Sequence, residues 1–110
     1  MPITGGNFAF TESNVNKAPA EHGVYALYDR DVTTYIGRAS GDGVTIRSRL
    51  KSHYCGDEGL CTVVATHYRR EVTSRPIARE SELLDEHEEI YGMLPRCLQA
   101  SALQRQADLA

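Results

Sequence analysis

The chain has 110 residues, of which 12 are lysine or arginine and 15 are aspartate or glutamate, so its formal net charge is −3. This length predicts one domain with a single modest core, and the charge excludes a global basic field that would attract nucleic acid or an anionic membrane. The sequence shows no apolar run long enough to span a bilayer and no secretory signal, so we expect a cytoplasmic protein with no membrane partner.

The expected organisation has three parts. Residues 1–20 are rich in Gly, Asn, Thr and Ala with little periodicity, and they predict an irregular N-terminal arm. Residues 21–98 form the expected domain. Residues 99–110 form a C-terminal tail, in which Leu103 and Leu109 are compatible with a short helix.

A hairpin is expected directly after the arm. Residues 23–29 and 32–37 both have strand-forming composition, and a turn-prone stretch separates them. If Tyr25 and Tyr35 lie opposite each other, both phenols project from the same sheet face. Tyrosine is also a common strand residue, so the pair indicates either half-buried strand formers or one wall of a site.

Three more elements follow the hairpin. Residues 44–54 predict a short helix, because apolar side chains recur on one side at helical spacing. Residues 60–68 are β-branched and apolar, which favours a third strand. The last element is a long helix that enters near Pro76 and stops at Pro95.

The three cysteines are Cys55, Cys61 and Cys97, an odd number without paired spacing. This predicts reduced thiols that pack as small apolar residues, rather than a disulfide framework. A zinc site built from His53, Cys55, Cys61 and His67 is an alternative, but the sequence lacks the close Cys-x-x-Cys spacing typical of such sites.

The short helix carries basic residues beside its apolar stripe. Arg49 lies at the border of the stripe, and His53 is four residues further on, so the two side chains are neighbours on one face. Arginine keeps its proton and is suited to stabilise developing phosphate charge. Arg47 and Lys51 supply further positive charge. The alternatives are an exposed helix cation and a packed core histidine.

The long helix carries many carboxylates. On a helical wheel, Glu86 and Glu88 lie at opposite borders of the apolar stripe, where a half-desolvated carboxylate suits a metal ion. The wheel does not separate these two. The other acids predict a solvated outer face: Glu80, Glu82, Asp85 and Glu89.

Taken in order, these segments resemble the GIY-YIG nucleases. Residues 23–25 and 35–37 resemble the two signature elements, residues 49–53 the helix that carries the family arginine, and residues 82–96 the second helix with its proline turn. The resemblance implies an α+β fold with a small three-stranded antiparallel sheet and helices packed on it. Counting back from Pro95 places the family's metal-binding glutamate on Glu86.

The resemblance also implies a function. It indicates a metal-dependent endonuclease that hydrolyses phosphodiester bonds in nucleic acid, DNA rather than RNA, with one divalent cation, Mg²⁺ or Mn²⁺, on Glu86. Tyr25 is then expected to position or deprotonate the attacking water, with Tyr35 orienting water or substrate beside it. Arg49 is expected to stabilise phosphate charge, and His53 to carry a proton or bind phosphate.

Substrate binding is assigned to Gly37, Arg38, Arg47 and Lys51. Because the total charge is negative, binding is expected to be weak and salt-sensitive, and a partner protein or homo-oligomer is expected to supply affinity. Leu98 replaces the family's usual asparagine. This departure favours the alternative function, a catalytically weak or inactive nucleic-acid-binding or protein-interaction module on the same fold.

Overall fold

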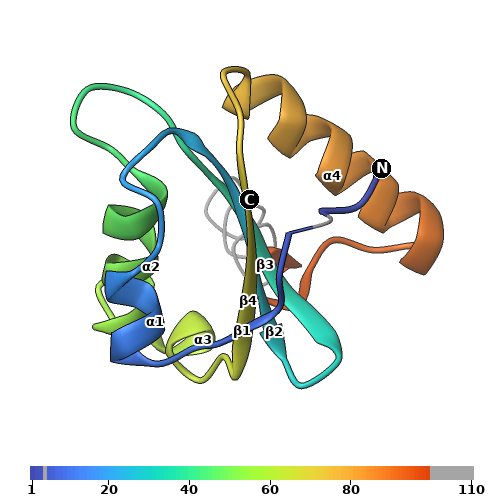
Figure 1. Cartoon of the computed structure of the whole chain (residues 1–110). Coiled ribbons are helices and arrows are strands. Elements are labelled where there is room, and N and C mark those ends of the chain that lie inside the picture. The colour runs from blue at the N-terminus through green and yellow to red at the C-terminus, as the bar shows by residue number, and fades with distance from the viewer. Residues whose placement is uncertain (4, 100–110) are drawn as a thin grey trace, which may run out of the picture.

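The computed structural model describes residues 1–3 and 5–99. Its α+β fold has three layers, with a four-stranded antiparallel sheet between helices (Figure 1). One side of the sheet carries α1 (Glu12–Asn16), α2 (Ile46–Tyr54) and α3 (Leu60–Val63), and the other side carries α4 (Pro76–Tyr91). The α+β class is confirmed, whereas the expected number of three strands is wrong.

The sheet has the order β1-β4-β2-β3, and every neighbouring pair is antiparallel. The strands are β1 (Phe8–Ala9), β2 (Gly23–Asp29), β3 (Val32–Ala39) and β4 (His67–Val72). The fourth strand comes from the N-terminal arm, where Phe8 pairs with Tyr68 and their rings stack with centroids 5.3 Å apart. The arm also contains α1, so the expectation of an irregular segment over residues 1–20 is wrong.

The expected hairpin is confirmed as β2 and β3. Tyr25 pairs with Gly37 and Leu27 pairs with Tyr35, so the two tyrosines are diagonal neighbours rather than direct partners. Because side chains alternate along a strand, this register places both phenols on the same sheet face. An irregularity after Leu27 shifts the register only toward the turn, beyond the two tyrosines.

The expected strand over residues 60–68 is wrong except at residues 67 and 68, where β4 begins. Residues 60–63 form α3, and β4 begins only at His67. Two tertiary contacts hold this segment despite its β-branched composition: Cys61 is bonded to Cys97, and the buried Thr62 hydroxyl contacts His53. Here tertiary structure overrides local propensity.

Both expected helices are present, and their ends follow from the sequence. At α2 the Thr45 side chain accepts from the Ser48 N–H while the Ser48 hydroxyl accepts from the Thr45 N–H, which forms a capping box. The long helix α4 begins at Pro76 and ends at Tyr91, and the following Gly92, with a φ of 71°, caps it before Pro95. No helix within residues 1–3 and 5–99 has the length and apolar character needed to cross a bilayer.

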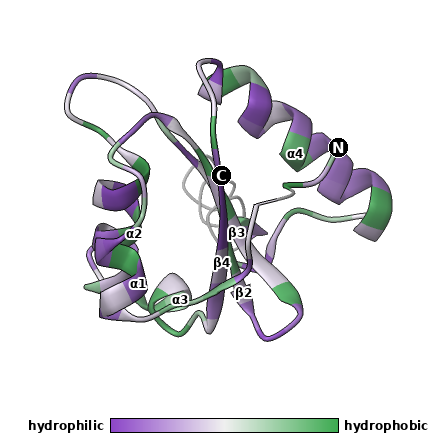
Figure 2. Ribbon diagram, in the orientation of Figure 1, coloured by the Kyte–Doolittle hydropathy of each residue, from purple (hydrophilic) through white to green (hydrophobic). Residues whose placement is uncertain are grey.

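The sheet separates two hydrophobic clusters. The cluster on the α2 side includes Tyr25, Leu27, Ile46, Leu50 and Tyr68. The cluster on the α4 side is built from shorter side chains: Ile3, Val24, Ala26, Ile36 and Leu83. Hydrophilic and hydrophobic stretches alternate along α4, as a helix packed on one face requires (Figure 2).

The prediction of reduced cysteines is wrong for two of the three. Cys61 and Cys97 form a disulfide across a sequence separation of 36 residues, and Cys55 is free and exposed. Spacing gave no sign of this pair because the fold alone brings α3 beside the segment that follows α4. With Cys61 in a disulfide, the zinc alternative loses one of its thiolates.

Candidate functional site

A buried polar cluster lies under the hairpin on the α2 side. The Tyr25 hydroxyl is 2.9 Å from His53 Nε2, and His53 Nδ1 is 2.9 Å from Thr62 Oγ1. All three residues are at most 2% exposed. The Tyr35 ring completes the cluster, with its centroid 4.6 Å from the imidazole and 6.0 Å from the Tyr25 ring. Each imidazole nitrogen therefore has a hydrogen-bond partner in either tautomer.

Gly37 has a steric reason to be glycine. A Cβ at this position would lie 2.5 Å from Tyr35 Cε1 and 2.7 Å from the Tyr25 hydroxyl oxygen. Real Cβ atoms do not approach other atoms this closely, so any larger residue would separate the two rings. The glycine expected to bind substrate therefore serves to pack Tyr25 against Tyr35.

The cluster is uncharged at neutral pH. Burial raises the pKa of Tyr25 and the adjacent Tyr35 adds to this effect, while the charge and hydrogen bond of Arg49 act in the opposite direction. Burial, assisted by the positive charge of Arg49, lowers the pKa of His53 to about 4. Tyr25 is thus a phenol and His53 a neutral imidazole, so Tyr25 is not prepared to act as a base in this state.

Arg49 links the buried cluster to the surface. It lies one helical turn before His53 on α2, and its Nη1 is 2.7 Å from Glu58 Oε1. Although burial opposes its charged form, the neighbouring Tyr25 and Glu58 raise the pKa of Arg49. The hydrogen bond from Arg49 in turn lowers the pKa of Glu58. The Arg49 guanidinium therefore favours the charged forms of both the buried Tyr25 phenol and the surface Glu58 carboxylate.

An open pocket of about 340 Å³ lies at the free edge of β3, next to this cluster. Its lining comes from both sides of the sheet: Tyr35, Arg38, Ser40, Val44, Arg49 and Glu80. Tyr35 and Arg49 belong to the α2 side. Glu80 comes from α4 on the other side, and its Oε1 is 2.6 Å from Arg38 Nη1. Tyr25 lies behind this pocket, fully buried.

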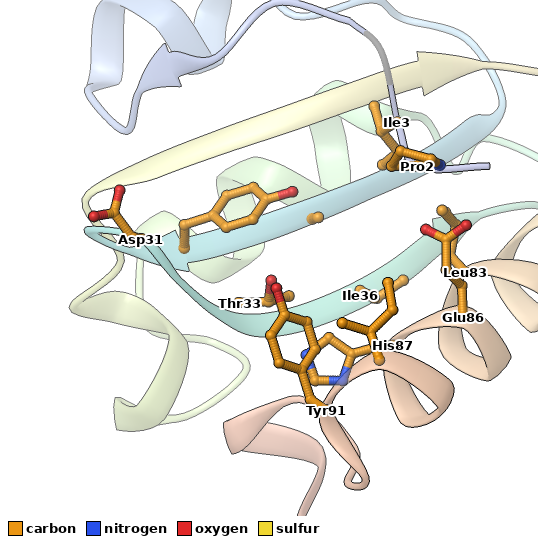
Figure 3. Close-up of a pocket in the computed structure, with 12 residues that line it drawn as sticks. Pro2, Ile3, Asp31, Thr33, Ile36, Leu83, Glu86, His87 and Tyr91 are labelled. Atoms are coloured by element: carbon orange, nitrogen blue, oxygen red, sulfur yellow. The ribbon is translucent and has the colours of Figure 1, made fainter.

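Glu86 does not join this pocket. Its carboxylate is 2.8 Å from the amino group of Met1, and it lines a separate pocket on the α4 side beside Ile3, Leu83 and His87 (Figure 3). The expected convergence of Glu86 with Tyr25, Tyr35 and Arg49 is therefore wrong.

Glu80 is a pocket carboxylate that the sequence pattern predicts on a solvated outer face. It precedes Leu83 by three residues and Leu84 by four, which places it on the inward stripe instead. Its side chain is only 17% exposed. The helical spacing to Leu83 is the signal in the sequence that places Glu80 on the inward side of α4.

Of the other residues expected to bind substrate, one lies at the pocket and two lie elsewhere on the molecule. Arg38 lines the pocket, whereas Arg47 donates from Nε to the Ala18 carbonyl at 2.8 Å and anchors the arm. Lys51 is exposed on α2. Glu58 and Thr62 were not anticipated, because neither lies near the hairpin or on the stripe of a predicted helix.

Comparison of the chain with protein-family models, with curated proteins and with solved structures found no match. The fold and the pocket define an α+β domain with a four-stranded antiparallel sheet and a polar pocket at the edge of β3.

Proposed function

We propose that this protein is a metal-dependent endonuclease of the GIY-YIG type, which hydrolyses phosphodiester bonds in DNA. One observation carries the proposal: a phenol, a guanidinium and a carboxylate, from Tyr35, Arg49 and Glu80, line the same open pocket at the edge of β3. Phosphodiester hydrolysis requires such groups, because water must be oriented and negative charge must be stabilised in the transition state.

The two pocket arginines are assigned to phosphate. Arg49 and Arg38 present guanidinium groups from opposite sides of the β3 edge, and guanidinium forms paired hydrogen bonds to phosphate oxygens. Arg49 stabilises the charge that grows on the phosphate in the transition state. Arg38, whose side chain is 44% exposed, binds the backbone of the nucleic acid.

The tyrosines have different roles. During hydrolysis the oxygen of water bonds to phosphorus, the water loses a proton, and the bond from phosphorus to the leaving sugar oxygen breaks. Tyr35 is the phenol that lines the pocket, so it orients this water. Tyr25 is fully buried and acts as a positioning residue, because its hydroxyl contacts His53, which lies one helical turn after Arg49 on α2. This role differs from the expected one, in which Tyr25 itself positions or deprotonates the water.

A divalent cation fits Glu80 in one specific way. Within residues 1–3 and 5–99 no group of three or more metal-ligating side chains converges, so a cage made only of protein ligands is not formed. Mg²⁺ is commonly held by one or two carboxylates together with water and substrate phosphate oxygens, and Glu80 supplies one carboxylate at the pocket. A bound Mg²⁺ or Mn²⁺ supplies charge neutralisation at the phosphate and the leaving oxygen.

The second candidate function is a nucleic-acid-binding or protein-interaction module without strong catalysis. It is favoured by the charge balance of the pocket, because Arg49 pairs with Glu58 and Arg38 pairs with Glu80. In that case the same surface binds DNA weakly and with strong salt dependence, and a partner protein or a second copy supplies affinity.

The test is a cleavage assay with matched carboxylate variants. Supercoiled, linear and branched DNA, and RNA, are incubated with Mg²⁺ or Mn²⁺ and with the natural chain, Glu80→Gln or Glu86→Gln. We expect roughly a 100-fold or greater loss of cutting for Glu80→Gln, the range for loss of a group that stabilises transition-state charge. Glu86→Gln, on the other side of the sheet, is expected to stay within about threefold.

Each other outcome has a defined meaning. Equal cutting by all three proteins indicates a contaminating nuclease and removes the enzyme assignment. Loss of cutting for Glu86→Gln alone overturns the choice of carboxylate. DNA binding without metal-dependent cutting on any substrate favours the non-catalytic module.

A further inference from the structure

Glu58 forms a surface ion pair with Arg49. Its Oε1 is 2.7 Å from Arg49 Nη1, and the two side chains are 35% and 26% exposed. The Arg49 side chain is therefore partly enclosed, and the carboxylate of Glu58 pairs with its guanidinium at the surface. A carboxylate oxygen and a phosphate oxygen accept from guanidinium in the same geometry.

The backbone of the loop that carries Glu58 is held in place, so the carboxylate can leave Arg49 only by rotation of the Glu58 side chain. Gly56 and Gly59 flank it with φ of 83° and 102°, values that glycine adopts without strain. The backbone of the loop is fixed at both ends, by Asp57 N–H donating to the Ser52 carbonyl and by the disulfide at Cys61. Rotation of the Glu58 side chain alone is enough to release Arg49.

We propose that Glu58 is a specificity-determining residue, whose carboxylate occupies the position on Arg49 that a phosphate oxygen of the nucleic-acid backbone takes on binding. The inference rests on the proposed function, because it identifies which group the substrate must displace. Binding is an exchange of anions on Arg49. A single free phosphate gains little from such an exchange, whereas a backbone that also contacts Arg38 gains from several contacts at once.

The chain offers a matched control for this role. Asp57 is the neighbouring acid on the same loop, and it takes part in no ion pair within the described part of the chain. Asp57→Asn and Glu58→Gln change the net charge equally and at almost the same place. Only Glu58→Gln removes the anion that faces Arg49.

The experiment measures binding of a fluorescein-labelled DNA duplex by anisotropy in EDTA, so that metal-dependent cutting is suppressed. We expect Glu58→Gln to bind roughly threefold to fivefold more tightly, the effect of removing one partly exposed competing pair. The logarithmic salt slope is expected to steepen by about one, because one more cation becomes free for phosphate. Asp57→Asn is expected to change affinity by less than about twofold.

The same comparison in an Arg49→Gln background shows whether the effect passes through Arg49. There Glu58→Gln is expected to lose its advantage over Asp57→Asn, and circular dichroism checks that each variant is folded. An equal gain for both loop variants, or a gain that persists without Arg49, is a simple net-charge effect and overturns the inference.

A second readout separates this inference from the nuclease proposal. Inorganic phosphate is titrated while the Arg49 Nε–Hε signal is followed by NMR. One outcome is that neither the natural chain nor any variant binds DNA, while phosphate shifts this signal at a several-fold lower concentration in Glu58→Gln than in the natural chain. In that case Glu58 competes with phosphate for Arg49 as proposed, and the nucleic-acid assignment fails. If phosphate shifts the signal equally in both proteins, or in neither, the role of Glu58 is wrong.

Discussion

The cores on the two sides of the sheet differ in the polarity of their side chains. On the α2 side, the core includes a hydrogen-bonded set of polar groups, Tyr25, His53 and Thr62. On the α4 side, the core is made of apolar side chains such as Val24 and Leu83. Burying polar groups is costly unless each is paired, whereas apolar packing needs no such pairing.

This difference indicates where function is expected. The polar cluster on the α2 side reaches the surface at Arg49, beside the pocket at the edge of β3. A chain that needed only stability would use apolar residues at these core positions, as it does across the sheet. The cluster is therefore best understood as support that holds Arg49 and Tyr35 in place.

The largest expected effect on stability comes from the disulfide that joins α3, on the α2 side of the sheet, to the segment after α4. Reducing the Cys61–Cys97 disulfide is expected to lower the free energy of unfolding by about 4 kcal/mol, from the entropy of the loop that it closes. Urea unfolding with and without dithiothreitol measures this. Cys55→Ser is the control, because this thiol is free and exposed. Unchanged unfolding midpoints after reduction would contradict the prediction.

The next effect is a pH dependence that belongs to the α2 side alone. Burial holds the pKa of His53 near 4, below its ordinary value of 6.5, so the unfolded chain binds more protons between these two values. The stabilisation from neutral His53 is therefore complete above about pH 6.5 and is lost as the pH falls toward 4, by about 3 kcal/mol in total.

Urea unfolding at pH 7.0, 5.5 and 4.5 tests this pH dependence. His53→Gln is expected to reduce the pH dependence, because the buried titrating group is gone. His87→Gln on α4 is expected to keep it, because His53 remains. A natural chain whose unfolding midpoint does not change over this range would show that His53 is not held in its neutral form.

Much of the α2 side could be predicted from sequence because its signals are local. Strand alternation identified the hairpin, and helical spacing placed Arg49 and His53 together on one face. Both elements are continuous in sequence, so their periodicity fixes which side chains share a face. The partners His53–Thr62 and Cys61–Cys97 come from separate elements, and no local pattern specifies them.

The carboxylate of the candidate site, in contrast, could not be chosen from local sequence signals alone. Glu80 and Glu86 lie on the same helix, Glu80 on its inward stripe and Glu86 at the border of that stripe. What separates them is the placement of α4 against the sheet, which brings Glu80 to Arg38 at the β3 edge and Glu86 to the Met1 amino group. A wheel describes one helix and contains no information about its neighbours.

The smallest of the three effects gives the most direct comparison of the two sides. Tyr25→Phe removes a hydroxyl that is buried against His53 Nε2, and leaves that nitrogen without its partner. Tyr28→Phe removes a half-buried hydroxyl on the α4 side. We expect Tyr25→Phe to lower the free energy of unfolding by about 1–3 kcal/mol and Tyr28→Phe by less than about 0.5 kcal/mol, measured by urea unfolding at pH 7.

The two variants, Tyr25→Phe and Tyr28→Phe, also show whether Tyr25 positions Arg49 or only packs in the core. If Tyr25 positions Arg49 as proposed, Tyr25→Phe weakens DNA binding as well as stability, because the cluster beside Arg49 loses the hydrogen bond between Tyr25 and His53. Tyr28→Phe leaves binding unchanged, because its side chain lies across the sheet from α2. Equal losses of stability in the two variants would mean that the polar cluster contributes no more than ordinary core packing, and the distinction between the two sides would fail.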